Sequence, residues 1–348
     1  MLPKETNQDY SHSYVSEKAS IHPSVRIDPF CTIYDDVVIG EGCHIGPNVT
    51  LYNGVRIGNN VRIMPGVVIS SDPSKLEFWR AGEELSGSLS PLAKIGDHVF
   101  IDTGTVIHGG VTIGDHCWIA SQVTIHDGAR IGKHVKIFPN ALISGIPQDL
   151  KFYGEKTTLE IGDGTTIRQS TTLNRGTEYY GKTVVGKNCL IMAFVHIAHD
   201  CIIGDNVVIA NAVNLGGHVE IDNFARIGGM VGIHQFVKLG KHVMISGGSR
   251  VSKDVPPYAK AGREPLQYEG VNSIGLRRYG YQNEQIHQIQ DIYRKVFLSG
   301  MNTSQSLAYI EAHLPATEER DEVITFLRNC NRGIIKRPSS FVNDNPDR

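Results

Sequence analysis

Histidines are concentrated in one part of this sequence, between residues 196 and 234. Four of the 15 histidines fall there, namely His196, His199, His218 and His234. A neutral imidazole can act as a general base, and backbone N–H groups such as those of Gly216 and Gly217 can stabilise an oxyanion. The segment therefore predicts a catalytic or substrate-binding site. Because HxxH with further histidines can also bind zinc, a metal site is the competing interpretation.

No motif in the sequence supports a covalent intermediate. There is no Gly-x-Ser-x-Gly turn, and no cysteine lies in an evident pairing with histidine. Five other histidines at comparable bend positions are expected to be solvent-facing residues of the fold: His98, His108, His116, His126 and His134. We therefore expect direct transfer to the substrate, with a histidine as the base.

A six-residue period positions these histidines. Aliphatic residues occupy every sixth position over most of the chain, as in Ile21, Ile27, Ile33, Ile39 and Ile45, or Ile191, Ile197, Ile203, Ile209 and Leu215. This period is typical of a β-helix, in which each hexad contributes one short strand and a bend, and the aliphatic side chain points inward. Gly, Asn and Asp tolerate the backbone angles of the bends. The sequence therefore predicts a mainly β protein built as a parallel β-helix.

The stacking of coils predicts which residues meet. With three hexads to a coil, residue n lies one coil from residue n+18. This rule places Gly217 one coil from His199, with His218 beside it. It likewise places His234 one coil from Gly216. The histidines and the Gly-Gly backbone are therefore expected to converge on one site.

The repeat also predicts how the chain is divided. We expect an N-terminal extension at 1–20, the β-helix at 21–255, a C-terminal helical domain at 256–336 and a disordered tail at 337–348. Stretches that break the hexads are expected to protrude as loops, at 70–94, 144–160 and 174–184. The spacing of apolar residues predicts helices at 272–279, 283–298, 303–313 and 317–329.

Composition excludes several classes of function. The 348 residues carry a formal net charge of −2, so there is no basic footprint for binding nucleic acid. No apolar stretch approaches the ~20 residues of a membrane span, and residues 1–20 lack the apolar core of a secretory signal. Six scattered cysteines form no evident disulfide framework. We expect a cytoplasmic protein without a transmembrane segment.

Several motifs between about residues 137 and 336 together resemble one family. They include IPQDLKFYGE, IRQSTTLNRGT, HIAHDC, GGHVEIDNFARIGGM and GVNSIGL. This part of the sequence is similar to the acyl-[acyl carrier protein]–UDP-N-acetylglucosamine O-acyltransferases, which carry out the first step of lipid A biosynthesis. The resemblance implies a left-handed parallel β-helix with a C-terminal α-helical domain, in a homotrimer with active sites between subunits. It also implies transfer of a (R)-3-hydroxyacyl group from acyl carrier protein to the 3-position of UDP-N-acetylglucosamine, without cofactor or metal.

The resemblance assigns roles to individual residues. His199 matches the general base, and Gly217 matches the glycine whose backbone N–H stabilises the oxyanion. Gly247 matches the position that measures the acyl chain, and a glycine there predicts a chain longer than ten carbons. The other positions that match substrate contacts are Gln148, Asp149, Lys151, His196, His218, His234, Gln235, Asn272 and Arg278.

Three features depart from the family's pattern. Ile274 stands where the family commonly has an acidic residue, and Tyr279 replaces the second of two adjacent arginines, which leaves the details of nucleotide binding open. Residues 38–79 align with 112–153 at a shift of 74, so the N-terminal coils look like an internal duplication. The first copy carries PSKLEFW in place of PQDLKFY and has no HxxHD, so we expect it to be architectural.

Other activities remain compatible with the sequence. The enzyme could act on a 3-amino sugar nucleotide and form an amide. The sister N-acyltransferase of the same pathway is a further alternative, although hexads that begin by Ile21 leave little room for the uridine-binding domain expected of it. Outside this class, a γ-type carbonic anhydrase would hold zinc on three histidines. A non-catalytic scaffold would be insensitive to His199→Ala.

Overall fold

The computed structural model describes residues 12–71, 92–330 and 332–336, and the chain divides into two compact units. Unit 1 is Met1–Phe194 with Ala198–Asp200, and unit 2 is Val195–Ile197 with Cys201–Arg348. The tail predicted at 337–348 and most of the loop predicted at 70–94 lie outside the described residues. In the described part, no helix is long and apolar enough to cross a membrane.

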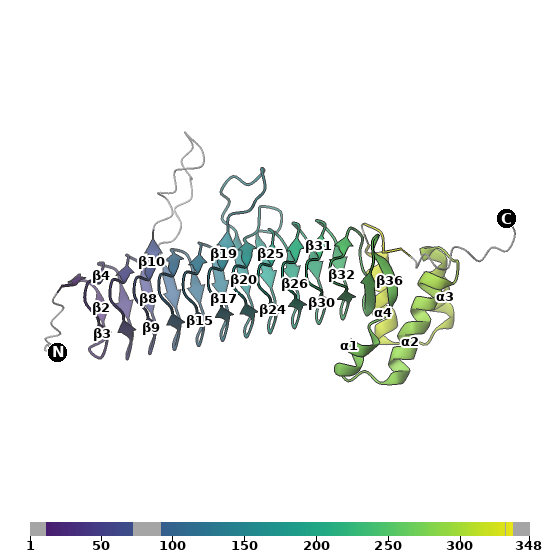
Figure 1. Ribbon diagram of the computed structural model, residues 1–348, viewed down its shortest axis with the longest axis horizontal. Coiled ribbons are helices and arrows are strands. Elements are labelled where there is room, and N and C mark those ends of the chain that lie inside the picture. The colour runs from purple at the N-terminus through teal and green to yellow at the C-terminus, as the bar shows by residue number, and fades with distance from the viewer. Residues whose placement is uncertain (1–11, 72–91, 331, 337–348) are drawn as a thin grey trace. The chain divides into compact units, whose positions relative to one another are not determined.

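Unit 1 consists of short parallel strands that form three sheets in its described part. The first sheet has the order β1 (Tyr14–Val15), β4 (Thr32–Ile33), β7 (Thr50–Leu51), β10 (Val68–Ser71), β13 (Val106–His108), β16 (Thr124–Ile125), β19 (Leu142–Gly145) and β22 (Thr172–Asn174). The second has the order β2 (Ser20–Ile21), β5 (Val38–Ile39), β8 (Val55–Ile57), β11 (Ala93–Ile95), β14 (Thr112–Ile113), β17 (Ala129–Ile131), β20 (Thr158–Ile161) and β23 (Lys182–Val185). The third has the order β3 (Arg26–Ile27), β6 (His44–Ile45), β9 (Arg62–Ile63), β12 (Phe100–Ile101), β15 (Trp118–Ile119), β18 (Lys136–Ile137), β21 (Thr166–Ile167) and β24 (Leu190–Ile191). Figure 1 shows these strands following one another coil by coil, from purple to teal.

An inward aliphatic residue on each strand fixes the register of unit 1. Ile107 on β13 pairs with Ile125 on β16, which pairs in turn with Ile143 on β19, and all three side chains are fully buried. Burial of one such side chain stabilises the folded state by roughly 1.5–3 kcal/mol relative to an exposed one. The bends use residues with positive φ, such as His116 at 58° and Asn140 at 60°. Among non-glycine residues, Asn, Asp and His adopt this conformation most readily.

The hexad register is confirmed, and with it the prediction of a mainly β, left-handed parallel β-helix. The coils begin earlier than expected, however. Tyr14 and Val15 of β1 pair in parallel with Thr32 and Ile33 of β4, within the stretch interpreted as an extension. The reason is visible in the sequence, because Val15 lies six residues before Ile21 and occupies the same inward position.

Two loops leave the coils in the part of unit 1 that the structure describes. Ile143 pairs with Leu173, which is 30 residues on, and the additional residues form a loop at 146–157 between β19 and β20. Ile161 pairs with Val185, and a shorter loop at 175–181 lies between β22 and β23. Figure 1 shows the 146–157 loop rising from the coils near β19. Both loops are therefore insertions that leave the ladder of strands on either side in register.

Unit 2 also contains parallel coils. Its three rows of strands are β25 (His196–Ile197), β28 (Asn214–Leu215), β31 (Gly232–Ile233) and β34 (Arg250–Val251); β26 (Ile202–Ile203), β29 (Glu220–Ile221) and β32 (Lys238–Leu239); and β27 (Val208–Ile209), β30 (Arg226–Ile227), β33 (Met244–Ile245), β35 (Ala259–Gly262) and β36 (Gln267–Val271). Helices alone were expected after residue 256, but β35 pairs in parallel with β33, and β36 pairs antiparallel with β35. These strands occupy backbone groups that the last coil would otherwise leave unpaired at an open sheet edge.

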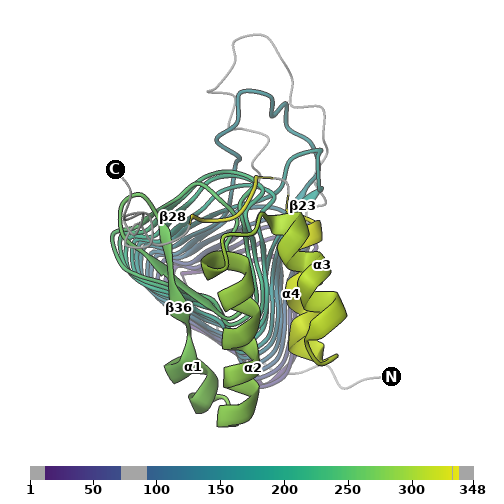
Figure 2. The same ribbon diagram turned by 90° about the vertical axis from the view of Figure 1, so that its right-hand side faces the viewer.

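The helices of unit 2 lie close to their predicted positions. They are α1 (Ser273–Arg278), α2 (Asn283–Tyr293), the π-helical turn η2 (Arg294–Leu298), α3 (Thr303–His313) and α4 (Glu318–Arg328). The side chains of Asn302 and Thr317 cap α3 and α4 by accepting hydrogen bonds from backbone N–H groups. Tyr268 of β36 stacks on the buried Phe297 at 4.3 Å between ring centres. Figure 2 shows α1 beside α2 and α3 beside α4.

Candidate active site

The side chains of His199 and Asp200 form a hydrogen-bonded pair at a bend of unit 1. Nδ1 of His199 lies 2.8 Å from Oδ2 of Asp200. Asp200 is fully buried, whereas the His199 side chain is 12% exposed. An imidazole whose Nδ1 is held by a buried carboxylate, and which keeps part of its ring exposed, is suited to proton transfer.

The 175–181 loop holds the Asp200 carboxylate. Thr177 donates hydrogen bonds to it from its hydroxyl at 2.6 Å and from its backbone N–H at 3.0 Å, and the backbone N–H of Tyr180 donates a third at 3.2 Å. Burial raises the pKa of the Asp200 carboxyl, but the hydrogen bonds from His199 and Thr177 outweigh burial and hold the pKa below its usual value. Since an ionised carboxylate can only accept, Nδ1 of His199 donates to it, and Nε2 is left as the basic nitrogen.

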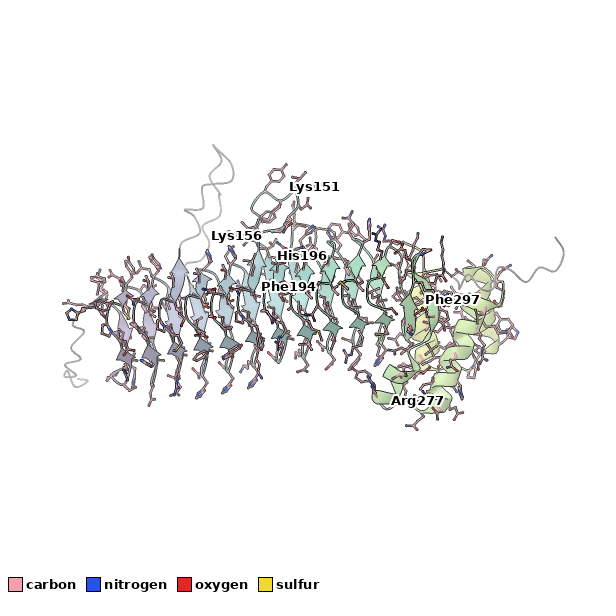
Figure 3. All side chains as sticks on the ribbon, in the orientation of Figure 1. Lys151, Lys156, Phe194, His196, Arg277 and Phe297 are labelled. Carbon is pink, nitrogen blue, oxygen red and sulfur yellow. The ribbon has the colours of Figure 1, made fainter. Side chains whose placement is uncertain are left out.

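The 146–157 loop approaches His199 on its basic side. Oδ2 of Asp149 lies 3.9 Å from Nε2 of His199. The backbone N–H of Lys151 donates to Oδ1 of Asp149 at 3.0 Å, which gives the loop a local turn. Gln148 and Lys151 are exposed, and Figure 3 shows the Lys151 side chain at the outer part of the loop. The structure thus brings Asp149 to His199 and leaves the polar groups of its neighbours available to a substrate.

Asp200, Thr177 and Thr183 were not predicted as site residues. The backbone N–H of Asp200 donates to Oγ1 of Thr183 at 2.8 Å, so Thr183 fixes the backbone of Asp200 and Thr177 fixes its carboxylate. The signal in the sequence was the adjacency of Asp200 to His199 in HIAHDC. The threonines could not be found from the period, because Thr177 belongs to a loop that breaks it.

A second group of predicted residues lies together in unit 2. His196 on β25 pairs with Asn214 on β28, which pairs with Gly232 on β31, so consecutive coils follow the 18-residue step. Figure 3 shows His196 on its coil. Nδ1 of His234 lies 3.1 Å from the carbonyl oxygen of Gln235. His234 and Gln235 are exposed.

Gly217 and His218 form the bend one coil before His234. The ring of His218 stacks on Phe236 at 4.3 Å, and the carbonyl oxygen of Gly217 accepts a hydrogen bond from the Phe236 N–H at 3.1 Å. Among the residues that the structure describes, none accepts a hydrogen bond from the N–H of Gly217. That N–H fits the oxyanion donor that was predicted there. Convergence of this bend with His199 would join the two units and stays a prediction.

The residues matched to nucleotide binding lie along α1 in unit 2, from its N-cap Asn272 to its last residue Arg278. Asn272 is engaged by the fold, since its side chain donates to the carbonyl of His242 at 2.9 Å and accepts from the N–H of Gly275 at 3.2 Å. A substrate contact of Asn272 therefore stays a prediction alongside this structural role. Arg278 and Ile274 are exposed.

Tyr279, which stands in place of an arginine, receives a guanidinium from elsewhere in unit 2. Nη2 of Arg226 on β30 donates a hydrogen bond to the Tyr279 hydroxyl, and its guanidinium carbon lies 5.6 Å from the centre of the ring. A positive charge is thus present beside position 279 although the second arginine is missing. Gly247, matched to the acyl-chain ruler, is exposed, and a Cβ added there would lie 3.2 Å from the carbonyl oxygen of Gly229.

The repeat places the chain in a broad class before any single relative is considered. The model of the bacterial transferase hexapeptide repeats matches residues 18–53, 39–71, 93–127, 110–145 and 182–217. A second model, described as UDP N-acetylglucosamine O-acyltransferase, domain 2, matches residues 254–335. The fold and the site therefore define a hexapeptide-repeat transferase.

Sequence relatives identify one family within this class of transferases. An acyl-[acyl-carrier-protein]–UDP-N-acetylglucosamine O-acyltransferase of Chlorobaculum tepidum is 55% identical over 204 residues, which cover 58% of this chain and 77% of that protein. The enzyme of the same name from Myxococcus xanthus is 40% identical over 202 residues, which cover 58% of this chain and 78% of that protein. The chain belongs to the acyl-[acyl-carrier-protein]–UDP-N-acetylglucosamine O-acyltransferase family, as its motifs predicted.

Solved structures agree with this assignment. A UDP-N-acetylglucosamine acyltransferase from Bacteroides fragilis is 38% identical, with a TM-score of 0.58, covering 92% of this chain and 100% of that one. A UDP-N-acetylglucosamine acyltransferase from Arabidopsis is 27% identical, with a TM-score of 0.64 and the same coverage of both chains.

Proposed function

We propose that this chain transfers a (R)-3-hydroxyacyl group from acyl carrier protein to the 3-hydroxyl of UDP-N-acetylglucosamine, the first step of lipid A biosynthesis. Membership of the family supports the substrates. The observation that carries the chemistry is the His199–Asp200 pair, because the carboxylate holds Nδ1 as a donor and leaves Nε2 to act as the base. The free N–H of Gly217 is the second group that the reaction needs.

The proposed reaction is a direct displacement. Nε2 of His199 removes the proton from the sugar 3-hydroxyl as its oxygen attacks the thioester carbon, and Asp200 stabilises the imidazolium that forms. The N–H of Gly217 donates to the tetrahedral oxyanion. The carbon–sulfur bond then breaks, and the pantetheine sulfur leaves with the proton held by His199. An ester and a free thiol result, with no metal in the sequence of steps.

Substrate contacts are proposed for the remaining matched residues. The exposed loop residues Gln148 and Lys151, together with Asp149, would contact the sugar nucleotide. The remaining polar contacts are proposed for His196, His218, His234, Gln235 and Asn272. Arg278, exposed on α1, is suited to the diphosphate or to the acidic carrier protein, because guanidinium groups bind phosphate and carboxylate in two-pronged geometry.

The assembly that we propose is a homotrimer in the cytoplasm. Family membership supports the proposal of a trimer with sites between subunits, and the use of acyl carrier protein as donor supports the proposal of a cytoplasmic location. Size-exclusion chromatography with light scattering tests the trimer, and a monomer that retains full activity would contradict it.

The experiment that tests the function is an acyltransfer assay. Wild-type protein and His199→Ala are given (R)-3-hydroxyacyl carrier protein with UDP-N-acetylglucosamine or with its 3-amino analogue. We expect the wild type to form product. His199→Ala should transfer the acyl group about 10²–10⁴-fold more slowly, which is the usual effect of removing a general base. The preferred sugar decides between ester and amide. If neither sugar is acylated, zinc analysis and CO2 hydration test the carbonic anhydrase alternative.

A further inference from the structure

A buried ion pair lies in unit 1 outside the residues assigned to the reaction. Oδ2 of Asp127 accepts a hydrogen bond from Nη1 of Arg175, and the carbonyl oxygen of Asp127 lies 3.3 Å from the same nitrogen. Both side chains are only 8% exposed. A buried ion pair often contributes no net stability compared with apolar residues of similar size. Its presence here therefore calls for a reason other than stability.

Arg175 connects this ion pair to the 146–157 loop. Its guanidinium carbon lies 5.5 Å from the centre of the Phe152 ring. Phe152 is 9% exposed, whereas its neighbours Leu150 and Tyr153 are 94% and 71% exposed. Phe152 is thus the buried side chain of an otherwise exposed part of the loop. It packs against a cation whose place is fixed by Asp127.

The residues around Arg175 fasten the loop at both ends. Asn174 donates a hydrogen bond of 2.5 Å to the carbonyl of Ile146, where the loop begins. Thr157, where the loop ends, donates a hydrogen bond of 2.5 Å to the carbonyl of Gly176. The next residue, Thr177, anchors the carboxylate behind the proposed base. One short segment therefore holds the loop on one side and the catalytic carboxylate on the other.

Two histidines beside the ion pair carry no charge that competes for it. His126, next to Asp127, stacks on His108 at 4.6 Å between ring centres, and His108 is buried, not solvent-facing as the sequence predicted. Burial lowers the pKa of His126 to about 4 and also lowers the pKa of His108. Both rings are neutral at physiological pH, so the Asp127 carboxylate is left to Arg175. In the first copy of the duplicated stretch, Asn53 stands at the position of Asp127, so this carboxylate belongs to the copy that bears PQDLKFY.

We infer that Asp127, acting through Arg175 and Phe152, positions the 146–157 loop and thereby sets where Asp149 lies against His199. Asp127 is a positioning residue, because its carboxylate pairs with Arg175 and influences the reaction through the position of the loop. The inference rests on the proposed function, in which Asp149 contacts the sugar nucleotide and His199 is the base.

The test measures kcat and KM of the full chain in the acyltransfer assay. Phe152→Ala removes the face on which Arg175 rests, and Phe152→Tyr keeps it. We expect Phe152→Ala to raise KM for UDP-N-acetylglucosamine about tenfold with a smaller change in kcat, because a misplaced loop binds substrate less well. Phe152→Tyr should match the wild type, and Asp127→Asn should resemble Phe152→Ala. Wild-type KM in Phe152→Ala would overturn the inference.

Two further variants separate positioning from general damage. Phe138→Ala removes a comparable ring, which lies 4.1 Å beneath the Arg168 guanidinium elsewhere in unit 1, and should leave KM unchanged. In an Asp149→Asn background, Phe152→Ala should raise KM less than about twofold further, because coupled residues are not additive. A full additive increase would overturn the inference. An inactive wild type would instead overturn the proposed function, so the two failures are distinguishable.

Discussion

Oγ1 of Thr177 donates a 2.6 Å hydrogen bond to Oδ2 of Asp200, the same carboxylate oxygen that lies 2.8 Å from Nδ1 of His199. A single oxygen thus receives a neutral hydroxyl donor from a loop and an imidazole donor from the neighbouring residue. The hydroxyl stabilises the ionised carboxylate and fixes its rotation, so the imidazole is held in one orientation and one tautomer. A residue that donates a hydrogen bond to the carboxylate therefore also influences the orientation and basicity of the histidine that the carboxylate holds.

Removal of the Thr177 hydroxyl should therefore impair the base without removing it. We expect Thr177→Val to lower kcat about tenfold, since hydrogen bonds to buried charged groups are worth about 1.5–3 kcal/mol. Thr177→Ser keeps the hydroxyl and should stay within about twofold of the wild type. Steady-state kinetics at saturating substrate measures both variants. Full kcat in Thr177→Val would contradict this role of the hydroxyl.

The lowered pKa of Asp200 makes part of the folding stability sensitive to acid. A carboxyl whose pKa is depressed in the folded state contributes stability above its ordinary pKa of 3.8, and this contribution is lost as the pH falls through the folded-state value. Asp200→Asn lacks that contribution at every pH. Between about pH 5 and pH 3, the free energy of unfolding should therefore fall less steeply with pH in Asp200→Asn than in the wild type. Urea titrations at several pH values measure the two slopes, and parallel slopes would contradict the prediction.

Breaking the buried ion pair should cost stability as well as substrate affinity. Asp127→Asn leaves the Arg175 guanidinium buried without its carboxylate, which typically lowers the free energy of unfolding by about 3–5 kcal/mol. The double variant Asp127→Asn/Arg175→Met removes the stranded charge and should recover part of that loss. Thermal and urea unfolding of the two variants measure the difference. A double variant less stable than Asp127→Asn would show that the charge is not the cause.

Gly247 allows a prediction about the donor. With no side chain at this exposed position, the wild type should prefer (R)-3-hydroxyacyl donors longer than ten carbons. Gly247→Met adds a side chain whose Cβ would lie 3.2 Å from the Gly229 carbonyl oxygen, and it should shift the preference to shorter donors. Competition assays with donors of several lengths measure kcat/KM ratios for both proteins. A clear preference of the wild type for the ten-carbon donor would contradict the prediction.

The sequence predicted the coils well because one physical rule governs them. The inward aliphatic residue must stack on its counterpart, so Ile107, Ile125 and Ile143 fall on consecutive rungs as the spacing requires. His199 was predicted from the 18-residue step to Gly217 and from the family resemblance, and its Nε2 lies 3.9 Å from Asp149 on a loop that carries matched residues. Helix ends were predicted closely because Asn302 and Thr317 are recognisable caps.

The rest depended on contacts that no period encodes. Thr177 and Asp200 meet across 23 positions, and Asp127 and Arg175 across 48, because two loops change the number of residues in a coil. β35 and β36 were missed because they close the coils with a different pairing, parallel on one side and antiparallel on the other. The Arg226–Tyr279 contact likewise joins a coil to a helix terminus that the sequence alone does not align.

Among the residues of unit 1 that the structure describes, strands pair with strands of neighbouring coils, as between β5 and β8, and between β8 and β11. Such an array can change length by whole turns, each adding a strand spacing of about 4.8 Å, without disturbing distant turns. We therefore expect that the number of turns before Ala93 can change without altering the pairing of the turns that follow. If Asp127 positions the 146–157 loop as we infer, the turn that carries Asp127 cannot be gained or lost in this way without moving Asp149.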